Sequence, residues 1–353
     1  MPVITVDWLE GRSREQKQAL VAEITEVVHR VGGSPVERIT VVMHDIPGDN
    51  WGRGGLLVSS LQSAPPAPPP LAAATAKPAL PETAVSLPLL DQAVRMFDLE
   101  QSRFQGMPVI SVHQPGYAYF LHRRHSDDYR PEELGVRSSA SGVIVCMEHS
   151  GTHIDAICHQ ADAQMLYGGI AAAEVCNSKG FTAHAIEEVP PIMAPGVLLD
   201  AAAEKGMPAL DAGHLVTAVD LEACCRRQGV EVRAGDVVLI RTGNAIFWHD
   251  PERFLAGPGM ASSASEWLAA KRVLAVGADN MAWDVIGLRD PAFGCQLPGH
   301  LILLARHGIY IIENLQLEEL AAAGHSRFTF ICLPLKFVGA TGSPVRPIAV
   351  VNA

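Results

Sequence analysis

The chain has 353 residues, of which 48% are apolar and 18% charged, and its formal net charge is −11. This composition supports a large hydrophobic core, whereas the acidic balance and the lack of any basic run longer than two arginines argue against a nucleic-acid or anionic-membrane surface. No apolar run reaches the roughly 18 residues of a membrane span, the first residues lack the features of a signal peptide, and the seven cysteines include no Cys-x-x-Cys pair. We expect a cytoplasmic protein with reduced thiols and with neither nucleic-acid nor membrane partners.

The first 60 residues carry the pattern of a small β-α-β unit. The stretch PVITVDWL alternates like a strand, and Ser13 with Gln16 forms a capping-box pattern before a run of apolar residues at helical spacing. Gly32-Gly33 ends this helix, and RITVVMHD, residues 38–45, predicts a second strand. One helix on two parallel strands leaves a sheet face uncovered, so we expect the unit to be stable only as a homo-oligomer.

Residues 61–88 separate this unit from the rest of the chain. They contain eight prolines and many alanines, a composition that is typical of a stiff, extended linker because it cannot form a ladder of backbone hydrogen bonds. We therefore expect a small domain over residues 1–60, a Pro/Ala-rich linker over residues 61–88 and a large domain over residues 89–353.

The large part of the chain alternates short apolar strands with helical stretches. The expected strands include SGVIVCME, GVLLD, DVVLIRTG, VLAVGAD, GIYIIENL and FTFICLPL, and the expected helices TAVDLEACCRRQG, ASEWLAAKR and GHLILLARHG. This alternation is typical of an α/β domain. It leaves the order of the strands open.

The stretch EHSGTHIDAICH holds three histidines and an aspartate within eleven residues, from His149 to His159. The local pattern predicts a buried strand, a glycine turn and then a helix that begins at Thr152, which would place Asp155 and His159 on one helix face. Imidazole and carboxylate groups in such a cluster suit Zn²⁺ or Mn²⁺. The alternative is a set of surface or helix-end histidines that bond to backbone groups.

The same stretch resembles the His-x-Gly-Thr-His-x-Asp-x-Pro-x-His motif of the cyclase-like metal-dependent hydrolases, the family of bacterial kynurenine formamidase and isatin hydrolase. Six positions of the motif match, and Ile157 replaces its proline. The similarity extends over most of residues 117–351 and includes LIRTG at 239–243 and GHLILLARHGIYIIENL at 299–315. The resemblance implies a swivelling β/β/α fold for the large domain.

The resemblance also implies a set of site residues. His149, His153 and Asp155 would bind a first divalent metal, Zn²⁺ or Mn²⁺, and His300 and Glu313 stand at the ligand positions of a second ion. Family members hold one or two ions, and Glu313 is compatible with two. His159 stands at the position of the general acid/base.

The chemistry that this family implies is hydrolysis of an amide, formamide or cyclic amide, or equally of a lactone, by metal-bound hydroxide. The segment at 114–131 mixes aromatic and basic residues, including Tyr117 and Arg123. It is expected either to line a pocket for an aromatic-derived, anionic small-molecule substrate or to be a solvated loop.

Residues 2–55 resemble the 4-oxalocrotonate tautomerase family. The match includes Pro2, Arg12 within LEGRS, and Trp51 within WGRGG. Removal of Met1 would expose the secondary amine of Pro2, which can act as a general base in keto–enol chemistry, and Arg12 would bind a substrate carboxylate. A second family arginine is replaced by Thr40; Arg38, two residues earlier, is expected to point to the same strand face and to compensate.

Together these patterns predict an α/β protein with two fused enzymes, a metal-dependent hydrolase and a tautomerase based on Pro2, acting in the breakdown of aromatic compounds. One alternative is a tautomerase as the main activity, with the large domain a scaffold or a metal-binding module. Another is a binding protein with a structural metal, for which a closed four-ligand site would be typical.

Overall fold

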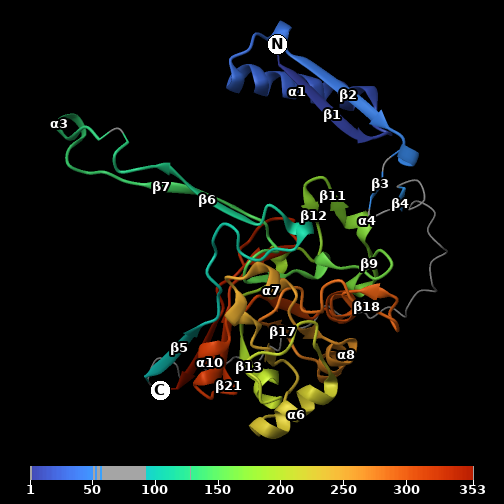
Figure 1. Cartoon of the computed structure of the whole chain (residues 1–353), viewed down its shortest axis with the longest axis vertical. Coiled ribbons are helices and arrows are strands. Elements are labelled where there is room, and N and C mark those ends of the chain that lie inside the picture. The colour runs from blue at the N-terminus through green and yellow to red at the C-terminus, as the bar shows by residue number, and fades with distance from the viewer. Residues whose placement is uncertain (1, 51, 54–55, 58–92, 128, 353) are drawn as a thin grey trace. The chain divides into compact units, whose positions relative to one another are not determined.

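The computed structural model describes residues 2–50, 52–53, 56–57, 93–127 and 129–352. Its internal contacts divide the chain into two compact units, Met1–Leu71 and Ala72–Ala353. Figure 1 labels the helices and strands of each unit. The expected linker at 61–88 lies outside the described residues. No helix in the described ranges is both long enough and apolar enough to cross a membrane.

The N-terminal unit has the expected β-α-β order. Strand β1 (Val3–Leu9) pairs in parallel with β2 (Thr40–Ile46), and α1 (Arg14–Gly32) connects them. The side chain of Ser13 caps α1 in the predicted capping box with Gln16, and Gly33 ends the helix with a φ of 66°. Short elements complete the unit: η1 (Val36–Arg38), η2 (Gly48–Asn50), β3 (Gly52–Arg53) and β4 (Leu56–Leu57).

None of the side chains whose exposure is described between residues 2 and 50 is buried. The apolar residues of α1 lie on two strands only, so one unit cannot bury them from water on all sides. This burial pattern is typical of a unit that needs a further surface to cover its sheet.

The larger unit is built around a nine-stranded sheet. Its order is β22-β8-β20-β17-β15-β13-β21-β23-β5, in which the four strands from β20 to β13 are parallel and their outer neighbours are antiparallel. The strands are β5 (Val94–Asp98), β8 (His153–Asp155), β13 (Ile192–Asp200), β15 (Val237–Arg241), β17 (Ala275–Ala278), β20 (Tyr310–Glu313), β21 (Arg327–Cys332), β22 (Gly342–Pro344) and β23 (Ile348–Asn352).

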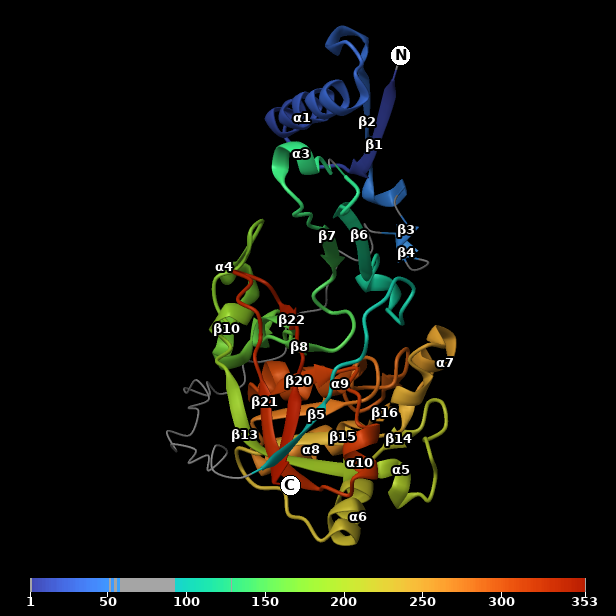
Figure 2. The same cartoon turned by 90° about the vertical axis from the view of Figure 1, so that its left-hand side faces the viewer.

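Helices and small ribbons surround this sheet (Figure 2). The helices are α3 (Pro131–Leu134), α4 (Ala172–Val175), α5 (Ala201–Glu204), α6 (Ala218–Gln228), α7 (Pro251–Leu255), α8 (Ser262–Lys271), α9 (Pro298–His300), η8 (Leu301–Arg306) and α10 (Glu318–Ala322). The two-stranded ribbons pair β6 (Tyr117–Arg123) with β7 (Ser141–Cys146), β9 (Met165–Leu166) with β10 (Ile170–Ala171), β11 (Cys176–Asn177) with β12 (Gly180–Phe181), β14 (Leu215–Val216) with β16 (Gly259–Met260), and β18 (Arg289–Asp290) with β19 (Cys295–Gln296). Single turns are η3 (Ser111–His113), η4 (Ile157–His159), η5 (Tyr167–Gly169), η6 (Ile186–Glu188) and η7 (Asn244–Phe247).

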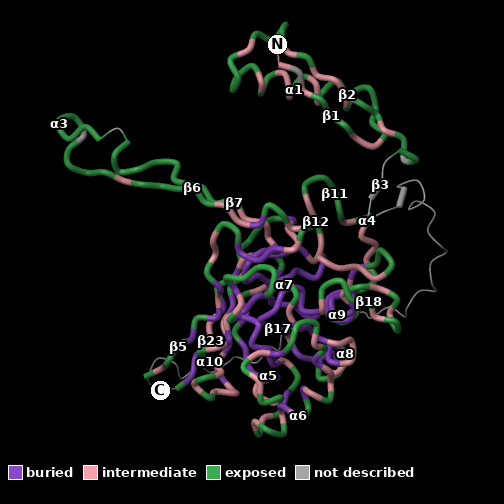
Figure 3. The backbone as a smooth tube through the Cα atoms, in the orientation of Figure 1, coloured by how far each residue is buried: buried purple, intermediate pink, exposed green. Residues whose placement is uncertain are grey.

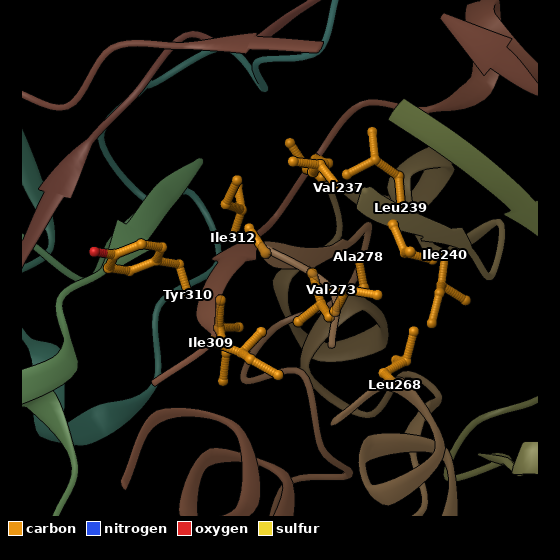
Figure 4. Close-up of a cluster of buried hydrophobic side chains, with 14 of the residues drawn as sticks. Val237, Leu239, Ile240, Leu268, Val273, Ala278, Ile309, Tyr310 and Ile312 are labelled. Carbon is orange, nitrogen blue, oxygen red and sulfur yellow. The ribbon is translucent and has the colours of Figure 1, made fainter. Parts of the chain in front are cut away.

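The core lies along the parallel strands of this sheet. Every residue of β15, β17 and β20 is buried, as the continuous apolar runs of these segments predict for strands that are covered on both faces. Figure 4 shows Val237 and Ile240 of β15, Ala278 of β17 and Ile312 of β20 in one cluster with Leu268 of α8.

Two expectations for the local structure are wrong. The predicted buried strand SGVIVCME is one side of a ribbon, because β7 pairs with β6 alone among the described strands and its residues are mostly exposed. The predicted helix from Thr152 is instead strand β8 followed by the turn η4. The hydrogen bonds that β8 makes with β20 and β22, both distant in the chain, replace those of a helix.

Candidate metal centre

The centre is built on β8, between β22 and β20. In a strand, alternate side chains point to one face, so His153 and Asp155 share a face while Ile154 between them is fully buried in the core. Antiparallel pairing sets Glu313 directly opposite His153. The His-x-Asp spacing therefore follows from a strand, and the expected helical register of Asp155 with His159 is wrong.

A tight loop brings His149 to the same place. Gly151 has a φ of 63°, a conformation that favours glycine, and the guanidinium of Arg103 donates hydrogen bonds to the carbonyls of Ser150 and Thr152. Thr152, expected to cap a helix, instead donates through its hydroxyl to the carbonyl of Asn314 at 2.6 Å. The loop is thus fixed from two distant segments of the chain.

The hydrogen bonds of His149 determine which of its nitrogens carries the proton. The hydroxyl of Thr341 donates to Glu148 Oε1 at 2.6 Å, so its oxygen accepts from His149 Nε2–H at 2.7 Å. The lone pair of His149 Nδ1 then faces Asp155 Oδ1 at 2.8 Å. Two lone pairs at this separation repel each other unless a proton or a cation lies between them.

His153 and His300 are oriented in the same way. His153 Nδ1–H donates to the carbonyl of Gly151 at 2.8 Å, and His300 Nδ1–H donates to Asp284 Oδ2 at 2.9 Å. The free Nε2 of His153 lies 3.5 Å from an oxygen of Asp155 and 3.5 Å from one of Glu313. The free Nε2 of His300 lies 3.6 Å and 3.2 Å from the other oxygens of these carboxylates. An acceptor on one imidazole nitrogen, with the other nitrogen directed inward, is the usual arrangement around a metal-binding histidine.

Two carboxylate oxygens complete the argument for a cation. Asp155 Oδ2 and Glu313 Oε1 are buried and accept no hydrogen bond of good geometry from the described residues, although Glu313 Oε2 accepts from the backbone N–H of Ala282 at 2.9 Å. A buried, unpaired carboxylate is costly. A divalent cation bound between these oxygens and the free imidazole nitrogens offsets that cost, so the residues fit a metal ion.

The charges of these groups are tightly linked. Burial lowers the pKa of His300, but its hydrogen bond to Asp284 and the charges of Glu313 and Asp284 raise it well above its ordinary value. His153 behaves similarly, since burial lowers its pKa and Asp155 and Glu313 raise it. Burial raises the pKa of Asp155, yet the surrounding histidines hold it well below its ordinary value.

His159 lies within the same cluster. Its ring stacks on that of His149 at 3.9 Å between centroids and lies 6.1 Å from that of His300. Potential ligand atoms of His149, His153 and Asp155 lie within 4.8 Å of one another, and so do those of Asp155, His159 and His300. Burial lowers the pKa of His159 to about 3, against the opposing charge of Asp155. The neutral imidazole can therefore either bind a cation or transfer a proton.

Sequence reasoning missed three residues that contact this cluster. Asp284 orients His300, Thr341 orients His149, and the half-buried His113 has its ring centroid 5.1 Å from that of His149 and 6.4 Å from that of His159. His113 precedes the segment at 114–131 that was singled out, but no periodicity or motif marks it.

The two residues proposed for a substrate pocket lie on β6. Tyr117 is half-buried at the start of this strand and packs against a small cluster with Met107 and Trp248. Arg123 is exposed at the other end of the strand, about 20 Å along it at the usual rise per residue. Within one chain, the length of β6 therefore separates Arg123 from Tyr117 and from the small apolar cluster that Tyr117 contacts.

In the N-terminal unit, Pro2 precedes β1, and its carbonyl accepts a hydrogen bond from the backbone N–H of Thr40 at 3.1 Å. Arg12 is exposed just before α1. Arg38 lies in the turn η1 and not in β2, which begins at Thr40, so the expectation that it shares a strand face with position 40 is wrong. Trp51 lies outside the described residues.

Comparisons with known proteins match both units. Residues 89–285 match the family described as "Putative cyclase". A solved structure of a novel cyclase is 29% identical to this chain, with a TM-score of 0.64, over 73% of this chain and 87% of the other. Isatin hydrolase A from Ralstonia solanacearum is 24% identical, with a TM-score of 0.54, over 73% of this chain and 92% of its own; at this identity the likeness concerns the fold.

The N-terminal residues 2–60 match the family described as "Tautomerase enzyme". A "Probable tautomerase" from Streptococcus pyogenes serotype M3 is 51% identical over 47 residues, which are 13% of this chain and 77% of the relative. The expected union of two family folds in one chain is thus confirmed.

Proposed function

Because the chain belongs to the putative cyclase family and carries a tautomerase domain at its N-terminus, we propose that its larger unit is a metal-dependent hydrolase. The linkage that it cleaves is an amide, formamide, cyclic amide or lactone. The observation that carries this proposal is the pair of buried oxygens, Asp155 Oδ2 and Glu313 Oε1, that accept no good hydrogen bond within the described ranges and face free imidazole nitrogens.

His149, His153 and Asp155 would hold one cation, and His300 with Glu313 would hold a second or complete the first site. When bound, Zn²⁺ or Mn²⁺ supplies Lewis acidity and lowers the pKa of a bound water. Asp155 belongs to both candidate ligand groups, so it is the residue that would bridge two ions. Asp284, Thr341 and the carbonyl of Gly151 hold the imidazoles in their metal-binding tautomers.

His159 is the proposed proton-transfer residue. His159 is half-buried and neutral, its ring stacks on that of His149, and among the described residues it has no hydrogen-bonded acceptor that would fix it as a ligand. A neutral imidazole can take a proton from the attacking water and return it to the leaving nitrogen or oxygen. The ring centroid of His113 lies 5.1 Å from that of His149 and 6.4 Å from that of His159, and we propose that His113 contacts the acyl substrate.

The hydrolase is tested by turnover of formylkynurenine, isatin and unsaturated lactones with Zn²⁺ or Mn²⁺. We expect hydrolysis of at least one of them, and about 10²- to 10⁴-fold slower turnover in His159→Ala with its metal content retained. The matched control is His307→Ala, an exposed histidine after η8, which should behave as the wild type. No turnover of any acyl substrate by metal-loaded protein, or full activity of His159→Ala, would contradict the proposal.

The N-terminal unit supports a second activity. We propose that the terminal amine of Pro2 is a general base for keto–enol tautomerisation and that Arg12 binds an anionic substrate. The hydrogen bond from Thr40 to the Pro2 carbonyl supports this because it fixes Pro2 at the head of β1. The test is the mass of the intact chain: loss of Met1 is expected, whereas a retained Met1 would leave an amide nitrogen without basicity and would exclude the mechanism.

A further inference from the structure

The described side chains of the metal centre offer no free arginine or lysine to a substrate. Within the described ranges, Arg103 is the one such residue that donates hydrogen bonds to the tight loop before β8, and the carbonyls of Ser150 and Thr152 accept them. The ion-pair partners of Asp155 and Glu313 in the same ranges are histidines alone. These two carboxylates balance the charge of one divalent ion and repel a further anion. The centre therefore favours a neutral substrate.

Apolar side chains flank this centre. The small cluster around Trp248 includes Ala282, whose backbone N–H donates to Glu313 Oε2 at 2.9 Å. Leu297 packs against the same cluster and precedes His300 by three residues. A charged substrate would lose much of its hydration in such surroundings, whereas an uncharged ring would not. The flank therefore also favours a neutral, largely apolar compound.

The N-terminal unit has the opposite preference. Arg12 is exposed, and its guanidinium makes no hydrogen bond or ion pair with any group that the structure describes. The described part of this unit is exposed or half-buried, in contrast to the buried interior of the larger unit (Figure 3), so an anion can bind while it keeps part of its hydration. A free arginine binds a carboxylate through two parallel hydrogen bonds. One chain therefore joins a site for a neutral compound to a site for a carboxylate.

On the basis of the two activities proposed above, we infer that the larger unit hydrolyses an enol lactone and that the N-terminal unit tautomerises the ring-opened product. An enol lactone is a cyclic ester whose ring oxygen is attached to a carbon of a C=C bond. Its hydrolysis turns a neutral ring into one molecule that carries a carboxylate and an enol. These are the two groups that Arg12 and the amine of Pro2 would take.

The other linkages proposed for the hydrolase give products that do not suit the second site. An amide or formamide releases an amine, and a saturated lactone releases an alcohol, so neither product has an enol proton for Pro2 to move. An open-chain enol ester does release an enol, but its carboxylate leaves on a separate molecule that Arg12 cannot hold together with the enol. The cyclic enol ester keeps both groups on one product.

The two steps balance without a further reactant. In the first step, water attacks the lactone carbonyl, a new C–O bond forms, and the bond between the carbonyl carbon and the enol oxygen breaks. The enol oxygen takes a proton, and the new carboxylic acid loses one to the solvent. In the second step, the amine of Pro2 takes the proton of the enol hydroxyl as the C=O bond forms, and the proton is returned to the far carbon of the former double bond. Neither step oxidises or reduces the compound.

The first step is tested with pairs of lactones that differ in their double bonds. Metal-loaded full-length protein would be assayed with α-angelica lactone against γ-valerolactone, and with 6-methyl-2-pyrone against δ-hexalactone. Because an enol is the better leaving group, each rate is divided by the rate of hydrolysis by hydroxide alone. We expect the corrected kcat/KM to be at least about tenfold higher for the enol lactone of each pair.

The second step is tested with the dienol that forms from the pyrone and absorbs ultraviolet light. In Pro2→Ala this dienol should decay at least about tenfold more slowly than in the wild type, because the secondary amine is lost. The dienol made by Pro2→Ala then serves as substrate for the other proteins. Arg12→Gln should raise the KM for it at least about tenfold, whereas Arg14→Gln, at an exposed arginine two residues later, is the matched control and should keep the wild-type KM.

The possible results separate the inference from the proposed hydrolase. If isatin or formylkynurenine is hydrolysed but neither enol lactone is, the inference is wrong and the hydrolase stands. If the dienol decays equally fast in the wild type and in Pro2→Ala, or if Arg12→Gln keeps the wild-type KM, the second step is wrong. If no acyl compound is hydrolysed by metal-loaded protein, the hydrolase itself is wrong, and the inference with it.

Discussion

At the scale of single residues, the centre is defined by which nitrogen of each histidine is free. The acceptors that fix His149, His153 and His300 are Thr341, the carbonyl of Gly151 and Asp284. These partners leave one nitrogen lone pair on each histidine directed at the carboxylates of Asp155 and Glu313. A cation between the nitrogens and the carboxylate oxygens would bind to both.

The first prediction concerns Asp284, which is buried and bonds to both His300 Nδ1 and the backbone N–H of Gly299. Asp284→Asn should weaken metal binding about 10- to 100-fold because the asparagine orients His300 less firmly. Competition with a chelator measures the affinity. Asp290→Asn, at the start of a surface turn, is the control, and equal affinities in the two variants would contradict the role of Asp284.

The second prediction concerns Asp279, whose carboxylate accepts hydrogen bonds from Thr242 and Gly243 in the core. Burial raises its pKa to about 6. The folded state therefore binds this proton more tightly than the unfolded state, so its stabilising contribution is complete below about pH 4 and is lost as the pH rises through about 6. Relative to Asp279→Asn, the wild type should lose about 2 kcal/mol of unfolding free energy between pH 4 and pH 7.

Urea unfolding of both proteins across this pH range measures that difference. A constant difference, or one that grows in favour of the wild type as the pH rises, would show that the pKa of Asp279 is not raised.

The sequence predicts only part of the centre at this scale. His149, His153 and Asp155 can be predicted to lie together because they are close in the chain and share a spacing. His300 and Glu313 depend on a family resemblance. Thr341 and His113 were missed because the fold brings them in: Thr341 bonds to a histidine 192 residues away, and nothing in its own neighbourhood marks it.

At the scale of elements, three-residue β8 decides the geometry of the centre. Its neighbours β20 and β22 come from the last 50 residues of the chain, so local pattern alone favoured a helix. The strands β13, β15, β17 and β20 were easier to predict, since each contains consecutive apolar residues that are buried. Only their order could not be predicted, because it depends on contacts between segments far apart in the chain.

The third prediction belongs to β22, which lies beside the histidine loop. A Cβ at Gly342 would lie 2.7 Å from His149 Cε1 and 3.1 Å from the carbonyl oxygen of Ile154. Gly342→Ala should therefore displace His149 and lower metal affinity about tenfold or more, with a loss of stability of about 1–3 kcal/mol. Gly32→Ala in α1, where the nearest atom lies at 3.9 Å, is the control for calorimetric metal titration; wild-type affinity of Gly342→Ala would mean that His149 is not a ligand.

At the scale of the whole molecule, two family folds share one chain as separate compact units. The sequence predicts this division from a change in composition and from two independent resemblances. The helix α1 of the N-terminal unit has no buried residue, so we expect this unit to need a further surface that covers it.

The fourth prediction is that the two activities can be removed one at a time. Pro2→Ala should lower tautomerase turnover by about 10² or more because the secondary amine is lost, and should leave hydrolysis unchanged. His153→Ala should do the reverse. Assays of both variants on an enol substrate and on the hydrolysed acyl substrate measure this; loss of both activities in either variant would contradict independent sites.

The central claim is that the cluster around β8 binds a catalytic divalent cation, and a direct titration tests it. Metal-free wild type and His153→Ala would be titrated with Zn²⁺ and with Mn²⁺ by calorimetry, with bound metal counted by elemental analysis. We predict one or two ions bound per chain in the wild type, and loss of at least one of them in His153→Ala, since that change removes a free nitrogen that faces both carboxylates. Equal stoichiometry and affinity in the two proteins would contradict the account.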